Sequence, residues 1–127
     1  MIFASEEHEK FYHEKVKQWR YQDCYHKSLI YILGILEDTR NHLSQIYDIE
    51  SGYIKPECLR QDWWASSSAR AIRLAFNLYT GKTPSVDYFD SSDEQLNECS
   101  EYSVNDIFSC DIAVYFWEGI KLRFDFK

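Results

Sequence analysis

The fold is decided by residues 66–81, which read SSSARAIRLAFNLYTG. Apolar residues in this stretch recur every three or four positions, as they do on one face of an α-helix. They are Ala69, Ile72, Phe76 and Tyr79. Gly81 and Pro84 then end the pattern, because glycine suits the position after a helix and proline does not continue one. The stretch therefore predicts an amphipathic helix with one buried face.

Similar spacings predict helices in the N-terminal part of the chain. Ser5 and Asp23 are suited to cap two helices, and Asp38 is suited to cap a shorter third one that carries His42. The inner face expected for the second helix consists of Tyr25, Leu29, Ile32, Leu33 and Leu36. The segment from Asp48 to Gly52 reads as a turn, and Pro56 suits the start of a single helical turn.

The C-terminal part is also predicted to be helical. Ser92 and Gln95 have the spacing of a capping box, and Ser103 suits an N-cap. Residues 111–123 favour a helix, although residues 120–126 alternate between apolar and charged side chains as a short strand would. We therefore expect one all-α domain, residues 1–127, of about five to six helices, with the last segment as helix or short strand.

The composition is that of a folded protein. Of 127 residues, 45% are hydrophobic and 17% aromatic, with only 4 Gly and 2 Pro, which excludes a disordered or low-complexity chain. No apolar run approaches the roughly 20 residues that span a bilayer, and the N-terminus lacks the pattern of a signal peptide. The four cysteines include no CxxC pair, so we expect reduced thiols in a soluble, cytoplasmic protein.

The net charge of −7 is concentrated in one segment. Residues 1–82 hold equal numbers of acidic and basic residues, whereas residues 83–120 hold nine carboxylates and no Lys, Arg or His. Direct nucleic-acid binding is not expected, because phosphate contacts need clustered Lys and Arg. The segment is either a solvated face or a surface that opposes a basic partner. The predicted partner contacts are Asp87, Tyr88, Phe89, Asp90, Asp93, Glu94 and Glu98.

The histidines and cysteines supply candidate ligands for a structural zinc ion. His8 and His13 cannot share a metal on a regular helix, because five residues rotate the second ring by about 140°. Side chains from separate helices could converge, since zinc ligands need not come from one local motif. The candidate ligands are Cys24, His26, His42 and Cys58. Free cysteine is also a common small buried residue, so a site without metal remains the alternative.

Other chemistry-bearing motifs are few. Asp38 and His42 lie four residues apart, where the carboxylate could orient the imidazole as in a general base, or act only as a cap beside a surface histidine. The GxSxG, GxGxxG and Walker patterns are absent from the sequence. In the pair Trp63-Trp64, we expect one indole to pack inward and the other to be exposed.

Four stretches carry a resemblance to known proteins. They are Asp23–Lys27 (DCYHK), Leu33–His42 (LGILEDTRNH), Ile54–Leu59 (IKPECL) and Arg73–Tyr79 (RLAFNLY). They resemble a family of small uncharacterised proteins found in Firmicutes, often on prophages and other mobile elements, and the similarity extends over nearly the whole chain. The resemblance implies roles for His26, Asp38, Arg40, His42 and Glu57. Within such elements, the chain resembles a type II anti-CRISPR protein that inhibits Cas9, which implies a bacterial cytoplasm as its location.

Two classes of function follow. The first is a non-enzymatic phage or mobile-element protein that binds Cas9 stoichiometrically and blocks DNA loading or cleavage, since Cas9 holds its guide–target duplex in a positively charged channel. The alternative is a small metal-dependent enzyme, such as a nuclease, that uses His26, His42, Asp38 and Glu57. A helical adaptor for another host partner is a third possibility. The missing basic patch counts against a nuclease, so we expect a binder rather than an enzyme. The sequence does not predict the oligomeric state.

Overall fold

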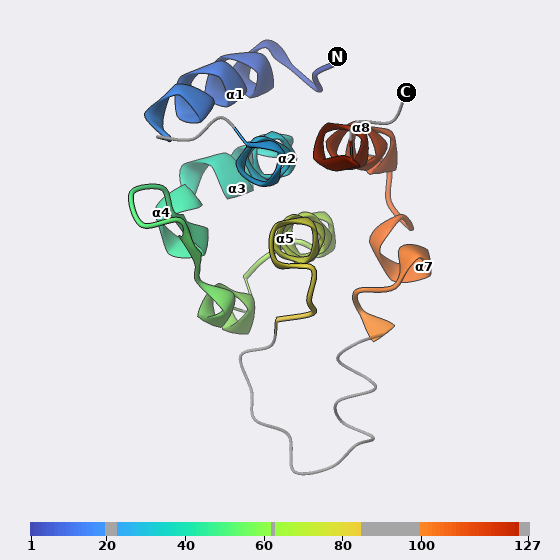
Figure 1. Cartoon of the computed structure of the whole chain (residues 1–127). Helices are drawn as coiled ribbons and strands as arrows, with labels where there is room; N and C mark the ends of the chain where they lie inside the picture. The colour runs from blue at the N-terminus through green and yellow to red at the C-terminus, as the bar shows by residue number, and fades with distance from the viewer. Residues whose placement is uncertain (20–22, 62, 85–99, 125–127) are drawn as a thin grey trace.

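The computed structural model describes residues 1–19, 23–61, 63–84 and 100–124 of the chain (Figure 1). Those residues are mostly helical, and the all-α prediction is confirmed. The helices are α1 (Glu6–Gln18), α2 (Cys24–Leu33), α3 (Glu37–Asn41), α4 (Leu43–Ile46), α5 (Ser66–Thr80), α7 (Val104–Ile107) and α8 (Ala113–Phe124). A 3₁₀ turn, η1 (Pro56–Arg60), and a small hairpin of β1 (Tyr47–Asp48) and β2 (Tyr53–Ile54) lie between α4 and α5.

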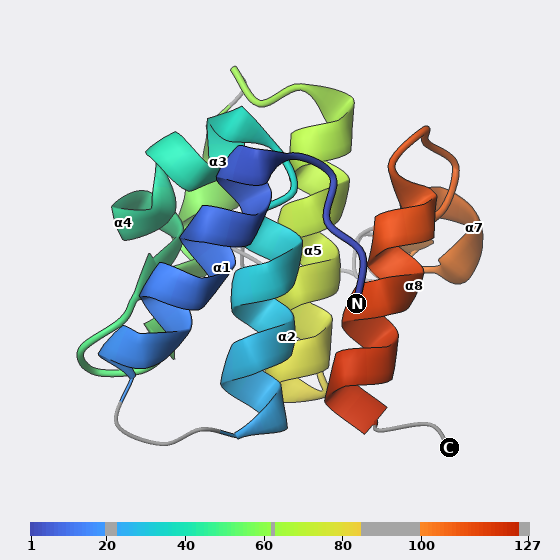
Figure 2. The same cartoon turned by 90° about the horizontal axis from the view of Figure 1, so that it is seen from above.

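Helix α2 lies at the centre of the molecule. Residues 29–33, which read LIYIL, are fully buried, so apolar side chains occupy every side of this helix rather than one stripe. Helices α1, α5 and α8 pack against it (Figures 1 and 2). The described residues therefore share one hydrophobic core with α2 inside it.

Two expectations for α2 were wrong at its ends. Tyr25 is 44% exposed because it lies in the first turn, where the Arg123 guanidinium covers its ring at 3.7 Å. The helix ends at Leu33, so Leu36 is not part of it. Its last carbonyls are bound by the next segment instead, since the Thr39 hydroxyl donates to Leu33 O at 2.5 Å and Arg40 Nη1 donates to Gly34 O at 2.8 Å.

Helix α5 is the helix predicted from residues 66–81. It runs from Ser66 to Thr80, and Gly81 follows in the left-handed conformation with φ 73°. The Gly81 N–H donates to Asn77 O at 2.8 Å, which closes the last turn of the helix. Of its predicted buried face, Ile72 and Phe76 are fully buried, whereas Ala69 and Tyr79 are half-buried.

Of four predicted N-caps in the described residues, three are confirmed and the fourth is wrong. The side chains of Ser5, Asp23 and Ser103 each accept a hydrogen bond from a backbone N–H in the first turn of α1, α2 and α7. Asp38 is no cap, because α3 begins at Glu37 and places Asp38 inside its first turn. Ser92 and Gln95 lie outside the described residues.

The hairpin is a feature that the sequence pattern does not predict. Tyr47 pairs with Ile54 and Asp48 with Tyr53, so each strand is only two residues long and leaves no alternation to detect. The predicted turn between them is present, with Gly52 at φ 77° and its N–H bonded to Asp48 O at 2.8 Å.

The C-terminal segment is helical as far as Phe124, so the helix prediction is confirmed over the strand alternative within the described residues. Phe116 of α8 is fully buried, and Gly119 faces Ile32 of α2. A Cβ atom at residue 119 would lie 2.7 Å from Ile32 Cγ1, so the glycine allows the close approach of α8. No helix in the described ranges has both the length and the apolarity to cross a membrane.

Candidate functional site

His26, the first predicted zinc ligand, is fully buried in α2. Its ring stacks on Trp19 with 5.3 Å between centroids, and Nδ1 lies 3.1 Å from the Tyr47 hydroxyl. Burial lowers the pKa of His26, although the backbone of Lys15 and the charge of Asp23 oppose this effect. The ring is therefore neutral at neutral pH.

A chain of hydrogen bonds runs from His26 through two tyrosines to the hairpin. The Tyr47 and Tyr79 hydroxyls are 3.2 Å apart, and Tyr79 donates to Gly52 O at 2.6 Å. Because that carbonyl only accepts, Tyr47 donates to Tyr79 and His26 Nδ1–H donates to Tyr47. Within the described residues no group meets Nε2 with full hydrogen-bond geometry, although a backbone hydrogen bond with Lys15 raises the pKa of the ring.

The other predicted zinc ligands lie in different surroundings. Cys24 begins α2, with Sγ 4.0 Å from Arg123 Nη1. Cys58 is buried in η1, and burial raises its pKa to about 12, so its thiol is protonated at neutral pH. His42 is half-buried between α3 and α4.

These four residues are not assembled into a metal site. Across residues 1–19, 23–61, 63–84 and 100–124, no three His, Cys, Asp or Glu side chains form a group able to hold a metal ion. His26 and Cys58 are buried in the core, whereas His42 faces a pair of indoles. The structural zinc site stays a prediction.

The predicted pair of Asp38 and His42 is present. His42 Nδ1 lies 2.8 Å from Asp38 O and 3.5 Å from Asp38 Oδ1. Ser68 Oγ donates to the other carboxylate oxygen, Oδ2, at 3.0 Å. The Ser68 hydroxyl is thus bound to the Asp38 carboxylate rather than to the His42 imidazole. This arrangement does not activate Ser68 as a nucleophile, because activation requires a contact between the hydroxyl and the base.

Two indoles cover the imidazole of His42. Its ring centroid lies 4.6 Å from that of Trp63 and 5.7 Å from that of Trp64. Trp63 is 45% exposed, whereas Trp64 is half-buried and donates from Nε1 to Cys58 O at 2.8 Å. The expectation of one inward and one exposed indole is confirmed, and the exposed one marks a surface suited to contacts.

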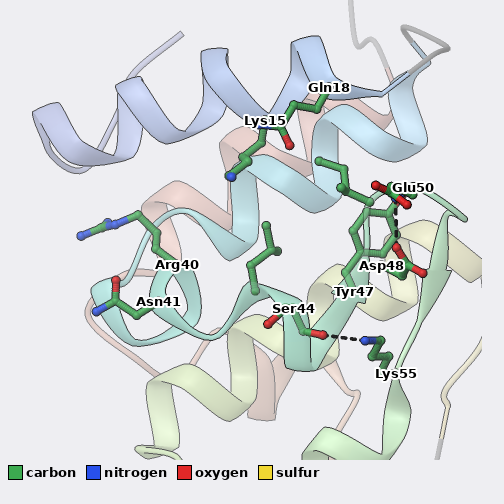
Figure 3. Close-up of a pocket in the computed structure, with 11 residues that line it drawn as sticks. Lys15, Gln18, Arg40, Asn41, Ser44, Tyr47, Asp48, Glu50 and Lys55 are labelled. Carbon is green, nitrogen blue, oxygen red and sulfur yellow. Dashed lines mark hydrogen bonds between the residues drawn. The ribbon is translucent and has the colours of Figure 1, made fainter.

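A pocket of about 330 Å³ lies between α1, α3, α4 and the hairpin (Figure 3). Three cationic side chains line it, together with two carboxylates. They are Lys15, Arg40, Lys55, Asp48 and Glu50. Its volume is at the lower end of the range of roughly 300–1,000 Å³ that is usual for small-molecule pockets.

Hydrogen bonds hold the hairpin side of this pocket. Lys55 Nζ donates to Ser44 O at 2.7 Å, and the backbone N–H of Glu50 donates to Asp48 Oδ1 at 3.1 Å (Figure 3). Hydrogen bonds from the Ser51 side chain and from the Glu50 backbone lower the pKa of Asp48, and the nearby Lys55 charge adds to this. Asp48 is therefore ionised at neutral pH.

The residues predicted to contact a partner lie outside the described part of the chain. These are Asp87, Tyr88, Phe89, Asp90, Asp93, Glu94 and Glu98. Of the acidic residues that follow, Glu101 pairs with Arg73 at 2.8 Å and Glu118 pairs with Lys121 at 2.6 Å, whereas Asp111 is exposed.

The model of a family of unknown function, DUF6075, matches residues 1–127. The chain belongs to this family. No curated protein and no solved structure matches it.

The sequence of this DUF6075 protein does not predict the pocket. Lys15, Arg40 and Lys55 come from α1, α3 and the segment after β2, so no local spacing links them. Arg40 is implied by the resemblance, and the structure places it both in the pocket and at the end of α2. Glu57, another implied residue, is exposed in η1.

Proposed function

We propose that the protein is a non-enzymatic phage or mobile-element inhibitor that binds Cas9 stoichiometrically through its acidic segment, residues 83–120, and blocks the loading or cleavage of target DNA. The observation that carries this proposal is the segregation of charge. Residues 83–120 contain nine carboxylates and no basic residue. A basic, DNA-binding channel is the complementary surface for such a segment.

Among the described residues, the helices that follow the acidic stretch lie away from the cationic pocket. Helices α7 and α8 lie on one side of the central pair α2 and α5, and α1, α3 and α4 lie on the other (Figure 1). Lys15 and Arg40 belong to that second side. The nine carboxylates of residues 83–120 would steer the protein toward a basic partner.

Exposed apolar side chains on the α7–α8 side would supply the anchors of an interface. Val104 on α7 is 75% exposed, and Trp117 on α8 is 50% exposed. Tryptophan is enriched among the residues that contribute most to binding, and charged groups around it favour correct orientation. The resemblance to type II anti-CRISPR proteins supports Cas9 as the partner and the bacterial cytoplasm as the place of action.

A Cas9 cleavage assay with the protein titrated in tests this function. We expect inhibition that saturates near one equivalent when the protein is added before target DNA, and little inhibition when DNA is bound first. Full cleavage at a large excess, with several Cas9 orthologues, would contradict the proposal. It would favour a helical adaptor with a different host partner.

The same assay separates the binder from the metal-dependent enzyme. The paired Asp38 and His42 side chains are the observation that favours the enzyme. An enzyme that uses His26, His42, Asp38 and Glu57 would act below stoichiometry and lose activity with a chelator or in His42→Ala. For the binder, we expect His42→Ala to leave the stoichiometry and the potency unchanged, because His42 lies on the side of the molecule away from α7 and α8.

A further inference from the structure

We infer that the pocket between α1, α3, α4 and the hairpin binds a small zwitterion of the short-peptide class, with its carboxylate at Lys15, near Arg40, and its ammonium at Asp48 and Glu50. This inference does not depend on the proposed docking role, because α1, α3 and α4, which line the pocket, lie on the side opposite α7 and α8 (Figure 1).

One end of the pocket provides donors for an anion. Lys15 is half-buried, and among the described residues no carboxylate forms an ion pair with its ammonium. Arg40 also lines the pocket, and the bond from Nη1 to Gly34 O at 2.8 Å holds its guanidinium at this end. Figure 3 shows Lys15 above the middle of the pocket and Arg40 and Asn41 at this end, with the Arg40 guanidinium directed away from the middle.

The opposite end provides acceptors for a cation. Figure 3 shows Asp48 and Glu50 close together at the hairpin end, joined by the bond from the Glu50 backbone to Asp48 Oδ1. Lys55 neutralises part of the Asp48 charge, but its ammonium is bound to Ser44 O at 2.7 Å. Glu50 is exposed, and its side chain is free to turn toward an ammonium group.

The middle of the pocket is apolar. Leu43, Tyr47 and Ile49 line it, and Tyr47 is fixed from behind by its bonds to His26 and Tyr79. A simple anion would meet the two carboxylates, and a simple cation would meet Lys15 and Arg40. A ligand with opposite charges at its two ends and an apolar part between them meets favourable contacts throughout.

NMR titration of the ¹⁵N-labelled full chain tests this inference with three dipeptide probes. They are glycyl-leucine, its N-acetyl form, which keeps only the anion, and its C-terminal amide, which keeps only the cation. We expect glycyl-leucine to shift the backbone signals of Asn41, Ser44 and Glu50 saturably. Each blocked form should bind about tenfold more weakly, since each loses one charged contact.

Two lysine variants on α1 identify the anion end. Lys15→Gln should weaken glycyl-leucine and its acetylated form and leave the amide unchanged, whereas the exposed Lys17→Gln should change none of the three. The same spectra report whether each variant is folded. The inference is overturned if no probe shifts the pocket signals, if the acetylated form binds as well as glycyl-leucine, or if the two variants behave alike.

Discussion

At the residue scale, His8 is a buried histidine whose tautomer is set by its neighbours. The Ala4 N–H donates to Nδ1 at 3.0 Å, so Nε2 carries the proton and donates to Tyr31 O at 2.8 Å. Burial lowers the pKa of His8 to about 4, the Tyr31 carbonyl opposes this, and the Arg40 charge adds to it. A second proton would have to sit on Nδ1 and break the bond from Ala4.

We therefore predict that stability falls as the pH is lowered from about 7 to 4. In this window His8 binds a proton in the unfolded chain, where its pKa is near 6.5, but stays neutral in the folded protein. The loss from His8 is about 3 kcal/mol by pH 4, on the basis of about 1.4 kcal/mol per pKa unit. Urea unfolding at several pH values measures it. His8→Gln should give a flatter curve, with the remaining slope due in part to buried His26.

A pH slope as steep in His8→Gln as in the wild type would contradict this assignment. NMR of the imidazole nitrogens provides a second check that does not depend on the variant. His8 should remain in the neutral Nε2–H form at pH 5, and titration near its ordinary value would be incompatible with the buried site.

A second prediction concerns the hydroxyl of Tyr79. It donates to Gly52 O and accepts from Tyr47, so Tyr79→Phe leaves a carbonyl and a buried hydroxyl with one partner fewer. We expect a loss of about 1–3 kcal/mol in the free energy of unfolding. The control is Tyr53→Phe, which should change stability little because Tyr53 is 74% exposed. Equal effects of the two variants would show that the chain of hydrogen bonds adds no stability.

At the element scale, the contact between α2 and α8 depends on a glycine. Gly119 faces Ile32, and an added methyl group at residue 119 would overlap its side chain. Alanine favours the helix by about 1 kcal/mol over glycine, but overpacking of a core costs about 1–3 kcal/mol. The second effect dominates here because Ile32 is fully buried and Cγ1, as well as the terminal Cδ1, would have to shift.

We therefore expect Gly119→Ala to destabilise the protein by about 1–2 kcal/mol in denaturant unfolding. Ile32→Val removes the Cδ1 atom that the new methyl group would meet. The double variant should therefore recover part of the loss caused by Gly119→Ala. If the double variant lost as much stability as the two single variants together, the two residues would not compete for space.

The elements that the sequence predicts well are those with local signals. The existence and the C-terminal end of α5 are predicted correctly because its apolar spacing and Gly81 lie within one short stretch, although the helix already begins at Ser66. Asp38 misled the prediction because its carboxylate accepts from Ser68, 30 residues away, and this contact is invisible to a local pattern. The hairpin was missed because strands of two residues have no period.

At the scale of the whole molecule, the candidate sites could be predicted only in part. The acidic segment is continuous along the chain, so the sequence alone identifies it. The pocket combines side chains of α1, α3 and the hairpin region, which only the packing of these elements brings together. The proposed zinc ligands have suitable chemistry, but their convergence would depend on tertiary contacts that spacing does not encode.

The central claim is that the acidic segment, residues 83–120, binds a basic surface of Cas9, and calorimetric titration of the protein into guide-loaded Cas9 tests it most directly. The account predicts one binding site per Cas9, weakened by salt. Binding should be lost when Asp87, Asp90 and Asp93 are all changed to Lys and kept when the exposed residues Glu14, Glu50 and Glu57 are changed in the same way. Absence of binding by the wild type, or equal losses in the two triple variants, would contradict it.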